Sequence, residues 1–300
     1  MTKLWPEGRL IDTEENRQAL LSRAALENAW RRQTILEGIA VRCDPEHHLY
    51  IECGEFRGVI PREECARGIR EGTTRDIAIL TCVGKPTSFV ITGFADGVPQ
   101  LSRRQAQELA LDQLLQAVPG DILPATVTHL EPYGAFVDIG CGVPSLIPLK
   151  AISVSRISHP GCRFQPGQQI YAVVREVLPE LGRIQLSHKE LLGTWFENAE
   201  HFVAGETVTG IVRSVMDYGI FVELAPNLTG LAEPLEGFQV GDTVSVYIKS
   251  ILPEKQKIKL AVIGHASPLP QPLPLTYLHT QGHVENWHYS DKATVVLPPE

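Results

Sequence analysis

Short runs of alternating apolar and polar residues dominate the middle of the chain. Between residues 118 and 190 such runs occur at 123–127, 135–139 and 184–187, with a brief apolar pair and a further apolar run between them. Alternation with period two is typical of strands that bury one face. Five strands in about 75 residues predict a small five-stranded β-barrel of the OB type, because a seven-stranded sandwich does not fit in that length.

The same unit occurs more than once. The sequence Glu-Pro-Tyr-Gly-Ala-Phe-Val-Asp-Ile-Gly at 131–140 matches Met-Asp-Tyr-Gly-Ile-Phe-Val-Glu-Leu-Ala at 216–225. Further along, 182–186 matches 256–260, and the third unit is shorter in the connection before its fourth strand. A fainter copy at 45–54 aligns with the same motif. Repetition of one supersecondary unit indicates a tandem array.

We therefore expect an all-β modular protein with three tandem OB-fold barrels, the first of them divergent, joined by short α-helical linkers. In chain order the predicted segments are an N-terminal helical segment 1–35, barrel one 36–104, a helical linker 105–117, barrel two 118–190, a linker 191–201, barrel three 202–264, and a Pro-rich connector with a C-terminal appendix 265–300.

Helical patterns lie outside the barrels. Thr13 before two glutamates is a typical helix start, and an apolar stripe then continues at helical spacing up to Gly38. The spacing of leucines predicts a helix over 103–118 and a shorter one over 189–203. The leucine and tryptophan residues of these segments are interpreted as packing residues.

Large aromatic residues stand on the strand face that the alternation leaves to solvent. Tyr50, Phe136 and Phe221 occupy this face at the same place in the second strand of each unit, and each precedes an acidic residue by two positions. Unpaired bases stack on such rings at roughly 1–3 kcal/mol per base. The alternative is that each ring packs under a loop or a neighbouring unit, but its threefold occurrence favours stacking.

Two tyrosines sit three residues before the second and third of these rings. Tyr133 and Tyr218 add a second stacking surface and a hydroxyl at the turn into the strand. Gly134 and Gly219 follow them, where glycine allows a sharp turn and leaves the backbone open to a ligand. Turn glycines beside half-buried tyrosines are the plainer interpretation, and both interpretations are compatible.

Polar and basic residues on neighbouring strands complete the predicted RNA-binding face. In an OB barrel the fifth strand runs beside the aromatic-bearing face, so outward side chains there and on the first strand are expected to meet phosphates. These residues are Arg183, Gln185, Lys257 and Lys259 on the fifth strands, and Arg42 and Arg213 on the first strands.

The pattern Gly-Ala/Ile-Phe-Val, closed by Gly-Arg-Ile-x-Leu-Ser, resembles the S1 RNA-binding domain, named after protein one of the bacterial small ribosomal subunit. Tandem copies joined by short helices are similar to shortened bacterial homologues of that protein. The resemblance covers 36–264 and implies single-stranded RNA binding with little sequence preference, in translation initiation or messenger handling. It places the contacts at Tyr133, Phe136 and Arg183 and at Tyr218, Phe221 and Lys257. Glu233 departs from it, because the family often has His there and a carboxylate repels phosphate.

The charge of the chain bears on how such a protein would bind. The net charge is -8, from 27 Lys and Arg against 35 Asp and Glu, but the three units carry only -1, 0 and -2. Most of the acidic excess therefore lies outside the barrels. Near-neutral barrels predict a binder of modest affinity and shallow salt dependence that relies on stacking as much as on phosphate neutralisation.

Other functional classes are less well supported. The stretches outside the repeats are too short for a catalytic domain and hold no P-loop, HExxH or Ser/His/Asp pattern, so no enzyme is expected. Cys43, His47, His48 and Cys53 lie close in sequence but lack the tight pairing of zinc sites, so neither a metal nor a cofactor is expected. The six cysteines form no CxxC pair, which favours reduced thiols.

Location and partners follow from the same reasoning. No apolar run reaches the length of a membrane span, and the first residues lack the apolar core of a signal peptide, so we expect a cytoplasmic monomer. The expected partners are single-stranded RNA, specifically mRNA, and the small ribosomal subunit. The alternative is a protein-docking or ribosome-associated regulatory module with little RNA binding, in which the divergent first unit docks on the ribosome or another protein.

Overall fold

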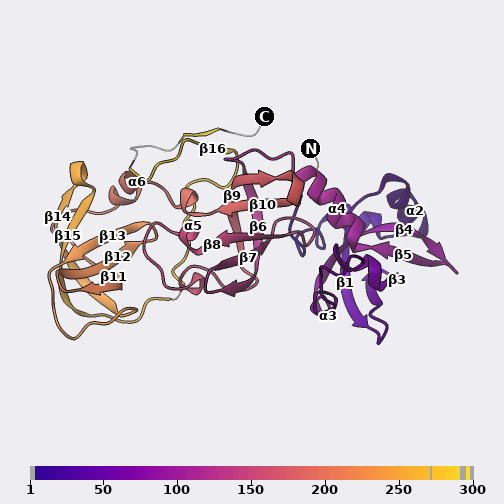
Figure 1. Ribbon diagram of the computed structural model, residues 1–300, viewed down its shortest axis with the longest axis horizontal. Coiled ribbons are helices and arrows are strands. Elements are labelled where there is room, and N and C mark those ends of the chain that lie inside the picture. The colour runs from indigo at the N-terminus through magenta and orange to yellow at the C-terminus, as the bar shows by residue number, and fades with distance from the viewer. Residues whose placement is uncertain (1–3, 271, 291–294, 298–300) are drawn as a thin grey trace.

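The chain folds into three β-barrels that follow one another along one long axis (Figure 1). The computed structural model describes residues 4–270, 272–290 and 295–297. Each barrel is closed and has five strands, so the predicted series of tandem OB-type barrels is confirmed. In Figure 1 the indigo first barrel lies at one end, the second in the middle and the orange third at the other end.

The strands of each barrel are short. Barrel one comprises β1 Leu36–Cys43, β2 Leu49–Cys53, β3 Phe56–Ile60, β4 Pro86–Ala95 and β5 Val98–Ser102. Barrel two comprises β6 Ile122–Glu131, β7 Gly134–Asp138, β8 Pro144–Pro148, β9 Gln169–Leu178 and β10 Arg183–Ser187. Barrel three comprises β11 Thr207–Met216, β12 Gly219–Ala225, β13 Leu228–Ala232, β14 Thr243–Leu252 and β15 Lys257–His265.

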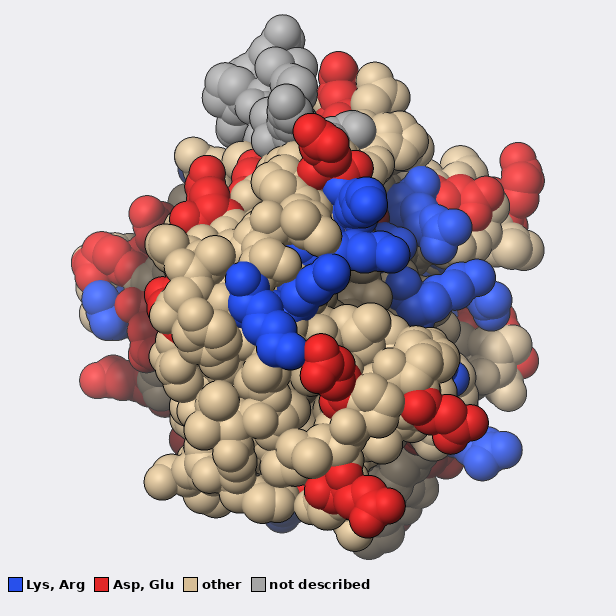
Figure 2. Space-filling model, turned by 90° about the vertical axis from the view of Figure 1, so that its left-hand side faces the viewer, with Lys and Arg blue, Asp and Glu red and all other residues tan. Residues whose placement is uncertain are grey.

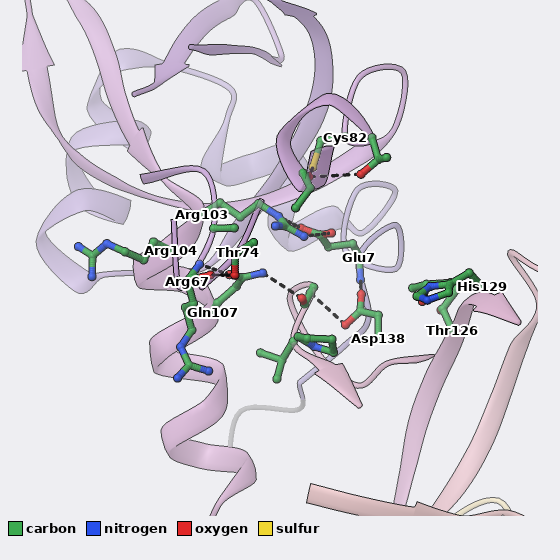
Figure 3. A pocket seen from close by; sticks show the side chains of 18 of the residues that line it. Glu7, Arg67, Thr74, Cys82, Arg103, Arg104, Gln107, Thr126, His129 and Asp138 are labelled. Carbon is green, nitrogen blue, oxygen red and sulfur yellow. Dashed lines mark hydrogen bonds and ion pairs between the residues drawn. The ribbon is translucent and has the colours of Figure 1, made fainter. Parts of the chain in front are cut away.

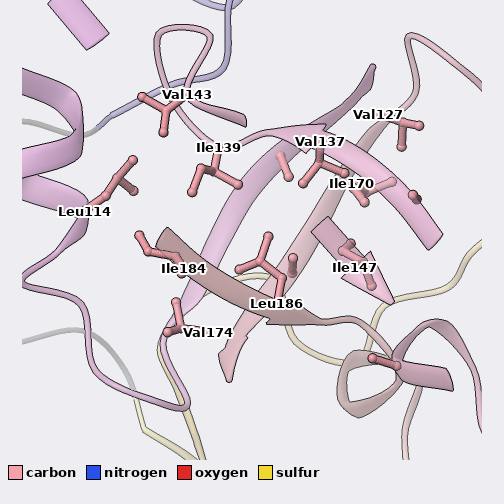
Figure 4. Close-up of a cluster of buried hydrophobic side chains, with 14 of the residues drawn as sticks. Leu114, Val127, Val137, Ile139, Val143, Ile147, Ile170, Val174, Ile184 and Leu186 are labelled. Carbon is pink, nitrogen blue, oxygen red and sulfur yellow. The ribbon is translucent and has the colours of Figure 1, made fainter. Parts of the chain in front are cut away.

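All three barrels share one topology. The first strand pairs with both the second and the fourth, and the third pairs in parallel with the fifth. The predicted alternation holds in β7, where Ala135 and Val137 are fully buried and Phe136 between them is only partly buried. Figure 4 shows the buried side chains converging inside barrel two, and Leu114, from the helical linker between barrels one and two, closes one end of this core. The core of each barrel is thus the inward face of its own strands.

The first strand of each barrel contains a β-bulge. The pairing register with the second strand shifts at Val41, Thr128 and Arg213 in barrels one, two and three. A bulge leaves one residue outside the ladder and redirects the side chains that follow it. Strict alternation therefore ends in the middle of these strands.

The connections between strands carry short helical turns. In barrels one and two the third-to-fourth-strand connection is long, whereas in barrel three it spans only 233–242 and has no helix. The short elements are η1 Arg62–Glu64 and α3 Ile77–Leu80 in barrel one, α5 Leu149–Ile152, η2 Pro160–Cys162 and η3 Pro179–Leu181 in barrel two, and η5 Pro253–Lys255 in barrel three.

The N-terminal helical region consists of two helices rather than one. The Thr13 hydroxyl accepts from the Asn16 amide and starts α1 (Glu14–Ala19), as predicted. The helix then breaks, because Ser22 caps a second helix, α2 (Arg23–Arg32). The predicted continuation to Gly38 is wrong, since that glycine lies inside β1.

The helices between barrels are capped by neighbouring hydroxyls. The linker after barrel one is α4 (Arg103–Leu114), and the Ser102 hydroxyl caps its first turn. The single helix expected over 189–203 is instead a 3-10 turn, η4 (Lys189–Leu192), followed by α6 (Trp195–Ala199). None of the helices in the described part of the chain is long and apolar enough to cross a membrane.

The segment before α1 ties barrel one to barrel two. Glu7 accepts from Arg103 Nε at 2.7 Å and from the Ser88 amide at 3.0 Å. Its own amide donates to the Asp138 carboxylate of barrel two at 2.7 Å. One residue of the N-terminal segment therefore bonds to β4, α4 and β7 at once, and holds the first two barrels together.

The segment after barrel three runs back over barrel two (Figure 1). The Leu278 amide donates to the Leu191 carbonyl at 3.0 Å, and Val284, which is buried, donates to Gly120 at 2.8 Å. The strand β16 (His283–Glu285) then pairs with β17 (Val295–Leu297). The sequence pattern predicted only a connector and an appendix here; its residues 271, 291–294 and 298–300 lie outside the described part of the chain.

Candidate nucleic-acid interface

Barrels two and three each present an edge-to-face pair of aromatic rings. The centroids of Tyr133 and Phe136 are 6.1 Å apart with an interplanar angle of 84°, and those of Tyr218 and Phe221 are 6.1 Å apart at 87°. Both tyrosines are more than half exposed. The same pair therefore occurs twice with the same geometry.

The bulge in the first strand decides what faces each aromatic of the second strand. In barrel one Arg42 pairs with Tyr50, and its guanidinium carbon lies 4.3 Å from the ring centroid. The Tyr50 hydroxyl also donates to Asp44, at 3.2 Å. The Arg42 guanidinium covers one face of the Tyr50 ring and Asp44 binds its hydroxyl, so a ligand at this place meets a guanidinium rather than an open aromatic face.

In barrel two the cross-strand partner is His129. Its ring stacks on Phe136 with centroids 4.2 Å apart and planes 9° from parallel. Sequence reasoning missed His129, because the repeat aligns Arg42 with Thr128, whereas in the strand pairing His129 takes the place that Arg42 has in barrel one. An exposed imidazole lying flat on Phe136 extends the stack outward.

In barrel three the partner of Phe221 is Ser214, whose short side chain does not cover the ring. Among the described residues Tyr218 is the only aromatic neighbour of Phe221. Of the three second-strand aromatics, Phe221 is thus the one left open.

The side chains next to these aromatics continue in register across four strands. We call this set of residues the aromatic row of each barrel. The rows are Arg42–Tyr50–Val59–Gln100 in barrel one, His129–Phe136–Leu146–Gln185 in barrel two and Ser214–Phe221–Leu231–Lys259 in barrel three. With strands about 4.8 Å apart, a row is about 14 Å wide. The aromatic and aliphatic members lie in the middle and a polar side chain lies at the fifth-strand end.

The basic residues of the fifth strands lie where the sequence placed them relative to the rings. Lys259 ends the row of barrel three, and Lys257 shares its face of β15 because it is two residues away. Both are exposed. Gln185 ends the row of barrel two, and the exposed Arg183 is on the same face of β10. Figure 2, which views the third barrel end-on, shows Lys and Arg side chains gathered in one band with acidic residues around it.

Glu233 does not act as an isolated negative charge on this face. Its carboxylate lies 2.8 Å from Lys249 Nζ, and this pairing holds the pKa of Glu233 below its usual range. The expected repulsion of phosphate is therefore reduced, because a lysine of the same barrel balances the carboxylate.

Arg213 was expected to contact phosphate, and the structure contradicts this. It is the bulged residue of β11, and its side chain is only 7% exposed, with Nη2 2.5 Å from Glu223. Glu223 is itself fully buried and also pairs with Arg163, which comes from the third-to-fourth-strand connection of barrel two. The bulge directs Arg213 toward the neighbouring barrel, so it joins barrels instead of facing solvent.

The acidic residues two positions after the aromatic residues are not all on the solvent-exposed face of the second strand. Asp138 is buried and accepts from the amides of Glu7, Gly140 and Gly142. Burial raises the pKa of Asp138 to about 7, although the amides of Glu7 and Gly140 act against that rise. These acids hold segments together beside the interface.

Gly134 and Gly219 are buried and do not leave backbone open to a ligand. A Cβ on Gly134 would lie 2.5 Å from the Ile147 carbonyl oxygen, and one on Gly219 would meet the Ala232 carbonyl oxygen more closely still. Glycine is needed at both places because the backbone of the paired third strand leaves no room for a Cβ atom.

Barrels two and three are joined by a second buried network around Asn227. Its side-chain oxygen accepts from the Val154 amide at 2.9 Å, and its amide donates to the Lys189 and Gly193 carbonyls at 2.7 and 3.1 Å. Together with the Arg163–Glu223–Arg213 triad, this network fixes the two aromatic rows relative to each other.

The cysteines and histidines of barrel one that lie close in sequence are engaged in other contacts. Cys53 is buried inside barrel one, where its thiol donates to the Ile51 carbonyl. Asp44, Glu46 and His48 form one compact group in the described residues, but Asp44 already accepts from His48 and Tyr50. The polar atoms of this turn therefore satisfy one another.

Comparison with known protein families identifies barrel two. Residues 117–189 match the model of the S1 RNA binding domain. The chain is 34% identical over 180 residues to small ribosomal subunit protein bS1 of Leuconostoc lactis, covering 54% of this chain and 42% of that protein. It is 31% identical over 163 residues to the small ribosomal subunit protein bS1 homolog of Bacillus subtilis (strain 168), covering 50% and 42%.

The chain therefore spans less than half the length of these relatives. Among solved structures, it is similar to a multidomain protein with nucleic acid binding domains from Streptococcus pneumoniae, with 14% identity and a TM-score of 0.26, covering 79% of this chain and 75% of that one. The predicted resemblance to tandem S1-domain proteins of the bS1 type is confirmed.

Proposed function

We propose that this chain, whose second barrel matches the S1 RNA binding domain, binds single-stranded RNA and acts on mRNA in translation, in association with the small ribosomal subunit. Such a role places it in the cytoplasm. The observation that carries the proposal is the aromatic row together with the exposed tyrosine beside it, because the Tyr–Phe pair has the same geometry in barrels two and three.

The row suits a single strand of RNA. Bases stack on exposed rings with little regard to sequence, whereas phosphates require nearby cations. In barrel three, Phe221 and Tyr218 offer the rings and Lys257 and Lys259 offer the cations. These residues, with Tyr133, Phe136, Arg183 and Gln185 of barrel two, are the proposed RNA contacts.

The fixed geometry of barrels two and three supports cooperation between their rows. When two sites are joined rigidly, the second binds at a high effective concentration once the first is occupied. Modest stacking on each barrel then gives useful affinity for a strand long enough to reach both. The Arg163–Glu223–Arg213 triad supplies the rigid joint.

The test is a titration of fluorescein-labelled polyuridine RNA into the wild type and a Phe136→Ala/Phe221→Ala double variant. Loss of one base stack costs roughly 1–3 kcal/mol, so each substitution should weaken binding about 5-fold to 160-fold. Phe238→Ala is the matched control, because this ring of barrel three stacks on His265 outside the row. The control should bind like the wild type.

Two outcomes oppose the proposal. If the double variant binds RNA as tightly as the wild type, stacking on the rows is wrong. If the wild type shows no RNA binding at low salt but co-sediments with small ribosomal subunits, the protein is a docking module instead.

A further inference from the structure

A groove of about 1190 Å³ separates barrel one from barrel two. One wall is the third-to-fourth-strand connection of barrel one, and α4 forms the floor. The opposite wall is β6 with the start of β10 (Figure 3). This volume exceeds the roughly 300–1,000 Å³ of small-molecule pockets, so it suits a segment of a polymer better than one small ligand.

Several charged groups of the groove are already engaged within the protein. Arg103 pairs with Glu7 at 2.7 Å, and Arg104 pairs with Glu108 at 2.7 Å and with Glu64. These ion pairs stiffen the floor of the groove and add little net charge. In Figure 3, Arg103 and Glu7 face each other above α4.

The remaining cations have no such partner. Arg67, Lys85 and Arg183 line the groove and form no ion pair with the described residues. Two lining carboxylates also lack an ion pair, Glu71 and the buried Asp138, and Asp138 instead accepts from three backbone amides. A Cβ placed on Gly182 would lie 3.5 Å from Arg67 Nη2, so the guanidinium of barrel one reaches the residue that precedes Arg183. Cations that line both walls of one groove favour an anionic ligand there.

The groove begins where the aromatic row of barrel two ends. His129 lines it and also stacks on Phe136, which places the stacking surface at its mouth. A strand that stacks on this row can therefore continue between the barrels without leaving the protein surface. The Glu7 contacts hold both walls in place before any ligand arrives, which lowers the ordering cost of binding.

We propose that the RNA segment leaving the row of barrel two runs through this groove, with its phosphates on Arg67, Lys85 and Arg183. This inference rests on the proposed function and extends it, because barrel one then binds backbone rather than bases. The divergent first barrel serves as the second wall of a phosphate-binding channel.

The test compares an Arg67→Gln/Lys85→Gln variant with wild type for a labelled polyuridine of about 16 nucleotides, a length near the upper site size of one OB fold. Each phosphate contact on a single strand adds about 0.7 to the slope of log affinity against log salt. Loss of two contacts should reduce the slope by about 1.4 and lower affinity about 25-fold at about 0.1 M salt relative to about 1 M.

Two control variants separate the groove from general charge. Arg31→Gln/Arg32→Gln removes two exposed charges from α2, outside the groove, and should leave the slope unchanged. Arg67→Lys/Lys85→Arg keeps the charge and should retain most of the wild-type slope. If the groove variant binds like the α2 variant, the inference is wrong while the proposed function stands.

Two further outcomes are distinct. If the wild type does not bind RNA at all, the proposed function fails and the groove assignment fails with it. If excess uridine monophosphate abolishes the difference between the groove variant and wild type, the groove binds a free nucleotide and the RNA path is wrong.

Discussion

Glu223 is the residue whose removal should cost this protein most. It is fully buried, and its carboxylate faces Arg163 from barrel two and Arg213 from its own barrel, which are 0% and 7% exposed. Glu223→Gln keeps the shape and removes the charge. Both guanidiniums then remain buried without a counter-charge.

The expected loss follows from that uncompensated charge. Breaking a buried ion pair by removing one partner costs about 3–5 kcal/mol, whereas an exposed pair contributes about 0–1 kcal/mol. For a unit of two barrels, about 1 kcal/mol corresponds to about 2–4 °C, so the melting temperature should fall by about 6–20 °C. Thermal unfolding followed by far-UV circular dichroism measures this.

Two comparisons make the result decisive. Glu233→Gln, on the same barrel but exposed and paired with Lys249, should lower the melting temperature by about 4 °C or less. Replacing the whole triad by Arg163→Met/Glu223→Leu/Arg213→Met should recover most of the loss, because apolar residues of similar volume leave no buried charge. A Glu223→Gln melting temperature equal to that of Glu233→Gln would refute the reasoning.

Two further predictions concern burial at single residues. Burial lowers the pKa of His188 from 6.5 to about 4, and its neutral ring bonds to the Ile152 carbonyl and the Tyr277 hydroxyl, each at 3.0 Å. The stability that the neutral ring contributes is complete above pH 6.5 and is lost as pH falls toward 4, by about 3 kcal/mol. Melting temperatures measured from pH 7 to 4 should therefore fall less steeply in His188→Gln than in wild type. An equal dependence of melting temperature on pH in the two proteins would contradict this. Gly219→Ala should destabilise barrel three by about 1–3 kcal/mol in urea unfolding, because its Cβ meets the Ala232 carbonyl, and an unchanged midpoint would show that the strands yield.

The barrels could be predicted because their determinants are local and repeated. Inward residues such as Ala135 and Val137 recur every second position, and the Tyr-Gly-x-Phe-Val motif recurs in the second and third units. The fifth strand was expected beside the aromatic-bearing face, and Gln185 and Lys259 do end the aromatic rows, although the third strand lies between the fifth strand and the aromatic one. Period and repetition are enough to define such a fold.

The joints between barrels could not be predicted, because they depend on contacts distant in sequence. Arg213 looks like an outward residue under strict alternation, and only the bulge, with Arg163 far upstream, turns it inward. The Glu7 contacts with Arg103 and Asp138 likewise join residues about 100 or more positions apart, and no local sequence pattern predicts them. His129 could not be predicted either, because the repeat aligns Arg42 with Thr128 and only the bulge at Thr128 places His129 opposite the ring.

The divergence of barrel one then has a physical reason. Its ring is covered by Arg42 and its hydroxyl is held by Asp44, so it has lost the open aromatic surface that Phe221 keeps. Two of its cations that form no ion pair with the described residues, Arg67 and Lys85, line the groove that faces barrel two. A first repeat that contacts RNA phosphates through basic side chains, instead of stacking on bases, would hold RNA without competing for bases. The near-neutral net charge of barrel one does not reveal that these basic residues lie on one side.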